Sequence, residues 1–357
     1  MDDIIVKSSS HSYAITIGEN VRFLVDNYVT KKYSSILVVS DKTVADLYAN
    51  DIMNSLKGEN TFLSIVPVGE QSKDIRLFYQ LHTEAINHGL DRQSLIIALG
   101  GGVIGDLAGF VASTYMRGID YIQLPTTILA HDSSVGGKVA INHELGKNLI
   151  GSFYPPKAVI YDTQTLQTLS EKEVRSGYAE LIKEALIADG AFLNSLLETD
   201  LFSLSTKELE EHLRTGIKIK ATIVEEDEKE AGNRKYLNLG HTLGHALETE
   251  LGYGTITHGE AVAIGLLFSI HVSELMYATK LPYNPLLKWF KKNHYPLDLR
   301  NIDEKSLLNI MKSDKKIMNK MIQMVLLKDT GQPTIQELDD EDLHSYLKSF
   351  ITKLSSE

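Results

Sequence analysis

Three histidines that lie close together in the sequence are candidates for metal chemistry: His241, His245 and His258. His241 and His245 are four residues apart, so on a helix their imidazoles share one face and can reach one ion. No glutamate follows His241, which disfavours the HExxH pattern of zinc proteases. His258 is expected at the start of the next helix. The best carboxylate candidate is Glu180, three residues before Lys183. The alternative is a surface ion pair between those two residues.

A glycine-rich turn predicts a nucleotide site. The sequence GGGVIGD at 100–106 follows the strand-like run SLIIAL and precedes a helix-like segment. Glycines allow a sharp turn and let a pyrophosphate approach the N–H groups at the start of the following helix. A tight turn without a ligand is the alternative. Glu70 and Lys73 follow an earlier strand-like run and a glycine, where a charged pair at a nucleotide's edge competes with a simple capped helix start.

A third group of turns suits oxyanions. It consists of PTT at 125–127, DSSVGGK at 132–138 and GKNLIG at 146–151. Hydroxyls, paired glycines and two lysines at turn positions can bind phosphate or carboxylate oxygens. Val139 follows Lys138, so the segment is not a Walker loop. A polar surface loop is the alternative.

The elements that must position these groups change character along the chain. Up to about residue 165, short aliphatic runs alternate with segments of helical periodicity, which predicts a mostly parallel sheet covered by helices. Ligands of such sheets bind beyond the carboxyl ends of the strands. Long helical stretches follow, and Pro155 and Pro156 mark the junction. We therefore expect an α/β domain over 1–166 and a mainly α-helical domain over 167–357.

Composition excludes several classes of function. The 357 residues include 36 Lys plus Arg, 47 Asp plus Glu and no cysteine, with a net charge of −11. Thiolate metal sites and thiol nucleophiles are therefore excluded. The acidic balance argues against nucleic-acid binding, and the acidic run at 225–230 is most simply a solvated surface. No secretory signal is recognised, and the longest uncharged apolar stretch, 261–270, is too short to span a membrane. We expect a cytoplasmic protein without membrane partners.

Taken in order, five motifs closely resemble the 3-dehydroquinate synthase family: GGGVIGD, PTTILAHDSSVGGK, GKNLIGSFYPP, SGYAELIK and NLGHTLGHALE. The match runs from about residue 36 to about residue 328. The resemblance implies a Rossmann-like amino-terminal domain, a helical carboxyl-terminal domain and an active site in the cleft between them. It also implies conversion of 3-deoxy-D-arabino-heptulosonate 7-phosphate (DAHP) to 3-dehydroquinate and phosphate by a homodimer. The implied cofactors are NAD and zinc, with Co2+ as a substitute.

The same resemblance implies roles for single residues. The implied metal ligands are Glu180, His241 and His258, which leaves His245 for proton transfer or substrate contact. The implied NAD contacts are Asp41, Glu70, Lys73, Gly100, Gly101, Gly102, Asp106, Thr126, Thr127, Lys138, Lys147, Thr165 and Thr168. The implied substrate and catalytic residues are Lys138, Asn148, Asp132, Lys183, Lys220, Arg234 and Asn238. Arg117 and either Lys315 or Lys316 are expected to hold phosphate and carboxylate groups, and Arg117 acts either in its own chain or across a dimer interface.

Two other enzyme classes fit parts of the pattern. A metal-dependent polyol dehydrogenase would share the glycine turn and two histidines but would release NADH. An aminocyclitol-forming sugar-phosphate cyclase would act on substrates without the carboxylate. The joint presence of Lys138, Asn148, Lys220, Arg234 and Asn238 favours dehydroquinate formation. A non-catalytic metal or nucleotide binder is a third class, disfavoured because every expected site position is filled.

Overall fold

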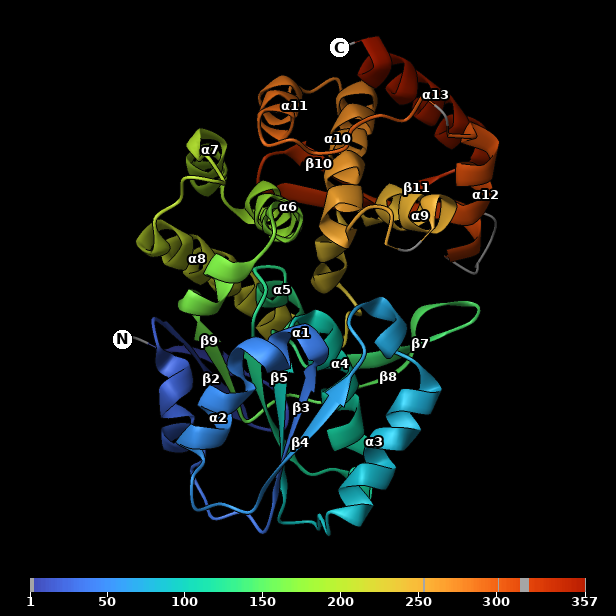
Figure 1. Ribbon diagram of the computed structural model, residues 1–357. Helices are drawn as coiled ribbons and strands as arrows, with labels where there is room; N and C mark the ends of the chain where they lie inside the picture. Colours follow the sequence, from blue (N-terminus) through green and yellow to red (C-terminus); the bar gives the residue numbers. More distant parts are fainter. Residues whose placement is uncertain (1–2, 253, 301, 315–320, 357) are drawn as a thin grey trace. The chain divides into compact units, whose positions relative to one another are not determined.

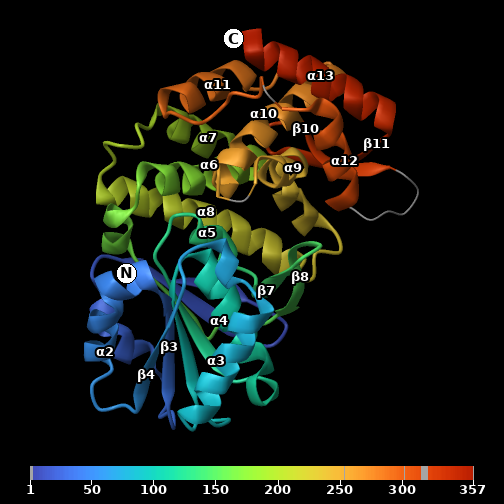
Figure 2. The same cartoon turned by 45° about the vertical axis from the view of Figure 1, so that its right-hand side comes forward.

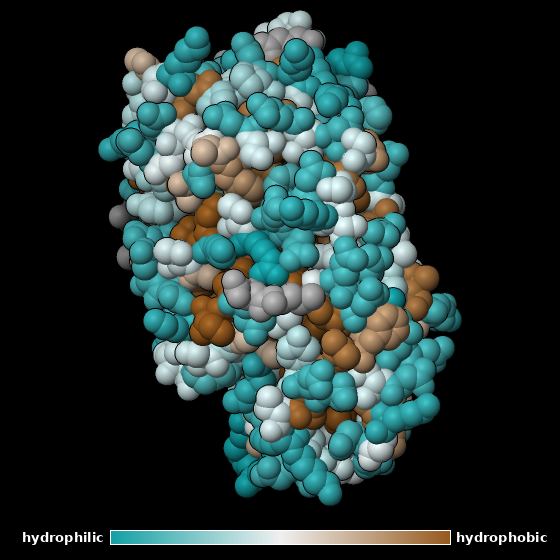
Figure 3. Space-filling view, turned by 90° about the vertical axis from the view of Figure 1, so that its left-hand side faces the viewer, coloured by the Kyte–Doolittle hydropathy of each residue, from teal (hydrophilic) through white to brown (hydrophobic). Residues whose placement is uncertain are grey.

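The computed structural model describes residues 3–252, 254–300, 302–314 and 321–356, and of residues 313 and 314 only the backbone (Figure 1). The chain divides into two compact units. Unit 1 comprises Met1–Leu169 and Ser205–Lys229, and unit 2 comprises Ser170–Leu204 and Glu230–Glu357. The face shown in Figure 3 is mainly hydrophilic, with hydrophobic side chains in separate patches.

Helix α8 (Thr206–Glu226) marks the main difference from the expected division at residue 166. The sequence-based division assigns this helix to the second domain, whereas the structure groups it with unit 1. Its side chains explain why. The Arg214 guanidinium donates to the Ile17 carbonyl oxygen at 2.7 Å, and a Glu225 carboxylate oxygen accepts from the Lys7 N–H at 2.9 Å. These contacts attach the helix to the first two strands of the sheet.

Unit 1 is built on the predicted parallel sheet. Its strand order is β1-β2-β9-β6-β5-β3-β4, and only the β1–β2 pair is antiparallel. Every residue of β5 is buried, as expected for a strand covered on both faces. The strands are β1 Ile4–Lys7, β2 Ser12–Gly18, β3 Ile36–Asp41, β4 Thr61–Val66, β5 Leu95–Gly100, β6 Asp120–Pro125 and β9 Ala158–Asp162.

Two apolar clusters cover the faces of this sheet. One contains Leu107 and Val111 on α4, and the other contains Val25 and Ile52. A separate hairpin, β7 (Lys138–His143) and β8 (Gly146–Phe153), packs against α4. The other helical elements of unit 1 are η1 Val21–Tyr28, α1 Lys42–Val44, η2 Ala45–Ala49, α2 Asn50–Ser55, η3 Glu70–Ser72, α3 Ile75–Asn87, α4 Gly102–Thr114, η4 Tyr115–Arg117, α5 Ala130–Ser133 and η5 Thr163–Thr168.

Unit 2 is mainly helical, as predicted. Helix α10 lies at its centre, and α6, α9 and α10 lie side by side (Figure 2). Its elements are α6 Glu171–Ala188, α7 Gly190–Glu198, η6 Asn233–Asn238, α9 His241–Leu251, α10 His258–Tyr277, α11 Tyr283–Lys292, α12 Glu304–Asp314, α13 Asp340–Ser356 and the hairpin β10 Ile322–Asp329 with β11 Gln332–Leu338.

Helix α10 is the one helix among the described residues with the length and composition to cross a membrane. The length of this apolar helix was underestimated from the uncharged stretch 261–270, because the helix continues on both sides of that stretch. However, 83% of its apolar window is buried within the protein. That burial is typical of a core helix.

Two glycines bring the backbone of α10 into direct contact with its neighbours. A Cβ at Gly259 would lie 1.9 Å from the Ser176 carbonyl oxygen on α6. A Cβ at Gly265 would lie 1.9 Å from the Gly240 carbonyl oxygen, just before α9. Only glycine permits approaches this close. The starts of α9 and α10 are therefore fixed relative to α6.

Candidate functional site

Unit 2 brings Glu180 and the three histidines together. The ligand-type nitrogens of His241, His245 and His258 lie within 4.8 Å of one another. Glu180 Oε1 lies 3.4 Å from His258 Nε2 and 3.7 Å from His241 Nε2. The carboxylate comes from the middle of α6, and each of the other two helices contributes its first residue. The structure thus assembles the donor set of one carboxylate and imidazoles that zinc and cobalt prefer.

The hydrogen bonds of His241 fit a cation at this position. Its Nδ1 lies 3.2 Å from the Leu239 carbonyl oxygen, so this nitrogen carries the proton and donates it. Burial lowers the pKa of His241 to about 3, so the ring is neutral at pH 7. Its Nε2 lone pair therefore faces the Glu180 carboxylate. A cation between them would turn this unfavourable pairing into two ligand bonds.

His258 is oriented by a second carboxylate. Its Nδ1 lies 2.9 Å from Oε2 of Glu248, which is on α9 and only 4% exposed. Burial disfavours the charged ring, but hydrogen bonds to Glu180 and Glu248 outweigh it and raise the pKa of His258 to about 10. With Nδ1 held by Glu248, Nε2 is the atom presented to Glu180. Metal-ligating histidines commonly have such a carboxylate partner.

The start of α10 is locally specified. Thr257 and Glu260 form a capping box, in which each side chain binds the other residue's backbone N–H. Glu260 also accepts hydrogen bonds from the Arg175 guanidinium on α6, at 3.0 and 2.8 Å. His258 is therefore attached to α6 through side chains as well as through the Gly259 backbone contact.

Other predicted residues of unit 2 are mostly buried polar groups. Lys183 Nζ lies 2.5 Å from Glu180 Oε2, and both side chains are almost fully buried, so the alternative of a surface ion pair is wrong. Arg234 is also almost fully buried, on η6. Asn238 Nδ2 donates to Glu230 Oε1 at 2.8 Å. Lys315 and Lys316 lie outside the described residues.

Three carboxylates near these groups were not predicted from the sequence: Glu230, Glu248 and Glu260. Glu230 belongs to the run expected to be a solvated surface, yet it is half-buried, bonded to Asn238 and left-handed at φ 59°. Glu228, in unit 1, accepts from the Ser9 N–H at 2.8 Å. The solvated-surface interpretation is therefore wrong for Glu230, whereas Glu225, Glu226 and Lys229 of the same run are exposed as expected. A Thr-x-x-Glu capping pattern at 257–260 was the one sequence signal available, for Glu260.

In unit 1, the predicted nucleotide contacts follow the carboxyl ends of neighbouring strands. Asp41 ends β3, Glu70 and Lys73 follow β4, the Gly100–Gly102 turn follows β5, and Thr126 follows β6. Cβ atoms at Gly101 and Gly102 would lie 3.0 Å from Thr127 Cγ2 and 2.8 Å from Ser133 Oγ.

The Thr126 hydroxyl fits a bound ligand. It is buried, and Oγ1 has no hydrogen-bond partner among the described residues. Such hydroxyls are normally bonded, so this one fits a site that binds a polar molecule.

Three other predicted NAD contacts have local partners. One carboxylate oxygen of Asp41 accepts from the N–H groups of Thr43 and Val44, and so caps α1. The Thr165 hydroxyl donates to the Asp162 carbonyl oxygen at 2.7 Å, and the Thr168 hydroxyl lies 2.7 Å from Tyr48 Oη. Asp41 ends β3, and Thr165 and Thr168 lie in η5, which follows the carboxyl end of β9, where the sequence pattern predicts the nucleotide.

A partly buried network, centred on the buried Lys73, joins the nucleotide-side and substrate-side candidates of unit 1. Lys73 Nζ lies 2.6 Å from Asp106 Oδ2 and also donates to Asn148 Oδ1. Burial raises the pKa of Asp106, against the opposite effect of Lys73. Lys147 Nζ lies 3.9 Å from Glu70 Oε1.

Lys220 and Asp132 form a second pair in unit 1. Lys220 Nζ lies 2.8 Å from Asp132 Oδ2 and also donates to the Asp132 carbonyl oxygen. Lys220 comes from α8 and Asp132 from α5. The remaining candidate, Lys138, is an exposed residue at the start of β7.

Arg117 stands apart from these groups. It precedes the amino end of β6, whereas Thr126 follows the carboxyl end, and a strand of six residues spans roughly 20 Å. Arg117 is exposed, and both it and Met116 have left-handed φ values, 69° and 50°. Consecutive non-glycine residues in this region are strained, which is common at functional positions.

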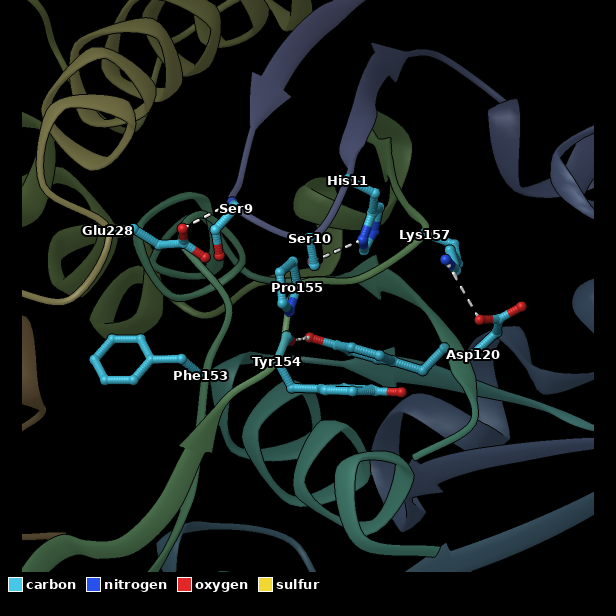
Figure 4. Close-up of a pocket in the computed structure, with 10 residues that line it drawn as sticks. Ser9, Ser10, His11, Asp120, Phe153, Tyr154, Pro155, Lys157 and Glu228 are labelled. Carbon is cyan, nitrogen blue, oxygen red and sulfur yellow. Dashed lines mark hydrogen bonds and ion pairs between the residues drawn. The ribbon is translucent and has the colours of Figure 1, made fainter. Parts of the chain in front are cut away.

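A polar pocket of about 320 Å³ lies at the same amino end of the sheet, away from the predicted nucleotide site. Its lining includes His11, Asp120 and Lys157, and Figure 4 shows Lys157 paired with Asp120. Their nitrogen and oxygen atoms lie 3.5 Å apart, and His11 Nε2 is bonded to the Pro156 carbonyl oxygen. None of the predicted site residues lines this pocket.

Solved structures share the fold of this chain. A 2-deoxy-scyllo-inosose synthase, complexed with carbaglucose-6-phosphate, NAD+ and Co2+, matches with a TM-score of 0.89 and 26% identity, covering 98% of this chain and 100% of that one. A glycerol dehydrogenase from Schizosaccharomyces pombe has a TM-score of 0.67 at 17% identity, covering 96% of this chain and 89% of that one, and shows the fold alone. The fold and the site thus define a protein of the sugar-phosphate cyclase class.

The sequence comparisons identify the family. Models described as 3-dehydroquinate synthase N-terminal and C-terminal match residues 63–176 and 177–317. The 3-dehydroquinate synthase of Oceanobacillus iheyensis is 53% identical over 356 residues, covering 99% of both chains. That of Bacillus pumilus is 49% identical, covering 97% of both. The chain belongs to the 3-dehydroquinate synthase family, and the comparisons support that enzyme activity for it.

Proposed function

We propose that the chain converts DAHP into 3-dehydroquinate and phosphate, with NAD and a divalent metal as cofactors. The observation that carries this proposal is the convergence of buried Glu180 on His241 and His258 in a member of this family. The solved 2-deoxy-scyllo-inosose synthase, whose bound ligands include NAD+ and Co2+, supports the cofactor assignment. Zinc is the proposed metal, with Co2+ as a substitute, because carboxylate and imidazole ligands suit both.

Glu180, His241 and His258 are the proposed metal ligands. The Leu239 carbonyl oxygen and Glu248 hold the Nδ1 protons of the two histidines, which presents both Nε2 atoms as ligands. When bound, the metal polarises a substrate oxygen as a Lewis acid, and NAD accepts a hydride and returns it. The ligand-type nitrogen of His245 lies within 4.8 Å of those of His241 and His258. From the family resemblance we assign this residue proton transfer or substrate contact.

Unit 1 supplies the proposed nucleotide site. The Gly100–Gly102 turn and the start of α4 offer N–H groups to a pyrophosphate. The buried Thr126 hydroxyl gains a partner when the nucleotide binds. The other proposed NAD contacts are Asp41, Glu70, Lys73, Asp106, Thr127, Lys138, Lys147, Thr165 and Thr168. The reaction therefore needs both units, since the metal ligands are all in unit 2.

Basic side chains are proposed to bind the phosphate and carboxylate of DAHP. They are Lys138, Lys183, Lys220 and Arg234, with Asn148, Asn238 and Asp132 as hydrogen-bonding partners. In this proposal these cations attract the anionic substrate although the chain is acidic overall. The net reaction breaks the C–O bond to phosphate and closes a carbon ring through a new C–C bond. The hydride taken from the substrate is returned to it, so NAD is regenerated.

One assay tests the reaction. Purified protein with zinc, DAHP and substoichiometric NAD is expected to release phosphate over many turnovers without accumulating NADH. Stoichiometric NADH would instead indicate a polyol dehydrogenase. Phosphate release from sedoheptulose 7-phosphate but not from DAHP would indicate another cyclase.

We also propose that the enzyme is a cytoplasmic homodimer in which Arg117 acts on the partner's substrate. A chain without cysteine needs no oxidising compartment. The strained, exposed Arg117 lies at the opposite end of β6 from the nucleotide site. Exposed Met116 is adjacent, and Phe153, also exposed, precedes Tyr154, whose hydroxyl donates to the Ile119 carbonyl oxygen. Exposed apolar side chains beside a functional arginine support an interface there.

Mixed dimers of R117A and H258A subunits test this arrangement. If Arg117 acts across the interface, the R117A subunit of a mixed dimer keeps its metal ligands and receives Arg117 from its partner. Random mixing of two inactive variants is then expected to restore about a quarter of wild-type activity, because half the dimers are mixed and each has one complete site. No recovery in verified mixed dimers would place Arg117 in its own chain's site.

A further inference from the structure

The β7–β8 hairpin contains an irregular register at Asn142. Ile141 pairs with Ile150, but His143 pairs with Gly146, so Asn142 lies opposite three residues, 147–149. The Asn142 N–H donates to the Lys73 carbonyl oxygen at 2.8 Å. Bulges of this kind re-aim side chains and are common next to active sites. The irregularity thus ties the hairpin to the segment that follows β4.

The amide nitrogen and the amide oxygen of Asn142 both form hydrogen bonds, each with a different residue. Its Nδ2 donates to Glu70 Oε1 at 2.7 Å, and its Oδ1 accepts from the Asn148 N–H at 2.9 Å. The amide orientation follows from these partners, because a carboxylate requires a donor and an N–H requires an acceptor. One half-buried side chain therefore bridges a proposed nucleotide contact and a proposed substrate contact.

Asn148 is held at two points by this network. Asn142 binds its backbone N–H, and Lys73 Nζ binds its side-chain Oδ1. Its φ is 56°, a left-handed conformation that asparagine tolerates better than most residues but that external contacts must select. The orientation of Asn148 therefore depends on Asn142 and on the segment that carries Glu70 and Lys73.

We propose that Asn142 is a positioning residue that couples nucleotide binding to substrate binding. NAD bound against Glu70 and Lys73 fixes the conformation of these two residues. The hydrogen bonds of Asn142 then hold Asn148 in one orientation. The substrate therefore binds an amide that is already in place. Because such coupling is reciprocal, substrate must strengthen NAD binding by the same factor. This inference rests on the proposed function, in which Glu70 contacts NAD and Asn148 contacts DAHP.

The test measures the coupling factor directly by calorimetry on the metal-loaded enzyme. The factor is the ratio of the NAD Kd without and with a phosphonate analogue of DAHP, in which a methylene replaces the bridging oxygen and phosphate cannot leave. Asn142→Asp keeps the acceptor for Asn148 but places an oxygen against Glu70. It is expected to lower the coupling factor roughly tenfold, the effect of one lost hydrogen bond to a charged group. Glu144→Gln, in the exposed turn of the same hairpin, is the matched control and is expected to keep the wild-type factor.

A double variant provides the rescue. In Asn142→Asp with Glu70→Gln, the glutamine amide can donate to the new carboxylate, so most of the coupling factor is expected to return. A merely structural role for Asn142 would change the melting temperature while the coupling factor stayed at the wild-type value, and that result would overturn the inference. A separate measurement tests the proposed function itself. If Glu70 does not contact NAD, the NAD Kd of Glu70→Gln alone will equal that of the wild type.

Discussion

The two units hold their site residues by different means. In unit 2 the proposed metal ligands stand on long helices, and the backbones of these helices touch at Gly259 and Gly265. In unit 1 many of the proposed nucleotide and substrate contacts stand on turns and on an irregular hairpin, and several are joined by side-chain hydrogen bonds through Lys73 and Asn142.

The two kinds of support predict different responses to substitution. Helix packing fixes the positions of ligands before any ion arrives, so the metal site should be lost as a whole when one ligand is removed. A hydrogen-bonded network distributes its effect over several weak contacts, each worth about 1 kcal/mol. Substitutions in unit 1 should therefore produce graded losses of affinity.

Removal of a ligand is expected to have the largest effect. His258→Ala should abolish metal retention after gel filtration, together with phosphate release from DAHP, because two remaining protein ligands do not hold zinc tightly. Metal content measured by mass spectrometry tests this expectation. His294→Ala, an exposed histidine elsewhere in unit 2, is the control. Unchanged metal content in His258→Ala would remove that residue from the ligand set.

Loss of the partner of a ligand should have a smaller effect. Glu248→Gln keeps the shape at α9 but replaces the negative charge that holds the His258 Nδ1 proton. Metal affinity, measured by competition with a chelator, is expected to fall roughly 10–100-fold. Activity should return at high zinc. Wild-type affinity in Glu248→Gln would mean that packing alone orients His258.

In unit 1, Thr126→Val should weaken NAD binding without lowering the stability of the fold. The substitution removes a buried hydroxyl that has no partner among the described residues, and it keeps the side chain's shape. The NAD Kd is expected to rise roughly fivefold to tenfold, while the free energy of unfolding stays equal or increases by about 1 kcal/mol. Metal content should not change. A large loss of stability would show that the hydroxyl has a structural partner instead.

The packing of unit 2 should also respond to pH. His271 is buried beside Tyr283 and Phe350 and bonded to the Ser349 hydroxyl, and burial, with the nearby Lys353 charge, lowers its pKa to about 4. Below pH 6.5 His271 binds a proton in the unfolded chain but stays neutral in the folded chain until the pH approaches 4. His271 therefore makes stability fall as the pH drops from 6.5 towards 4, by on the order of 1–2 kcal/mol at pH 5.

Urea unfolding at pH 7 and pH 5 measures this effect. The difference in the free energy of unfolding between the two pH values should shrink in His271→Gln, since glutamine has no titratable group. An equal difference in both proteins would assign the pH dependence to other residues.

The sequence sufficed for the features that local patterns encode. Aliphatic runs predicted the parallel sheet, and the spacing of His241 and His245 placed two imidazoles on one helix. The sequence also singled out Glu180 as the carboxylate candidate, and the family motifs implied that it is a metal ligand. Tertiary contacts were not predictable in this way. Glu248 is on the same helix as His241 but binds a histidine on the next one, so no spacing rule indicates its role. Asn142 acts through a change of strand register that has no sequence signature.

The contacts at Gly259 and Gly265 have a consequence for how such enzymes can be recombined. Helices α6, α9 and α10 meet backbone to backbone, so no adjustment of side chains can absorb a change in the path of one helix alone. A chimera that takes α10 from one relative and α6 from another inherits mismatched main chains at the metal ligands. The three helices should therefore be exchangeable between relatives only together, as one inherited block.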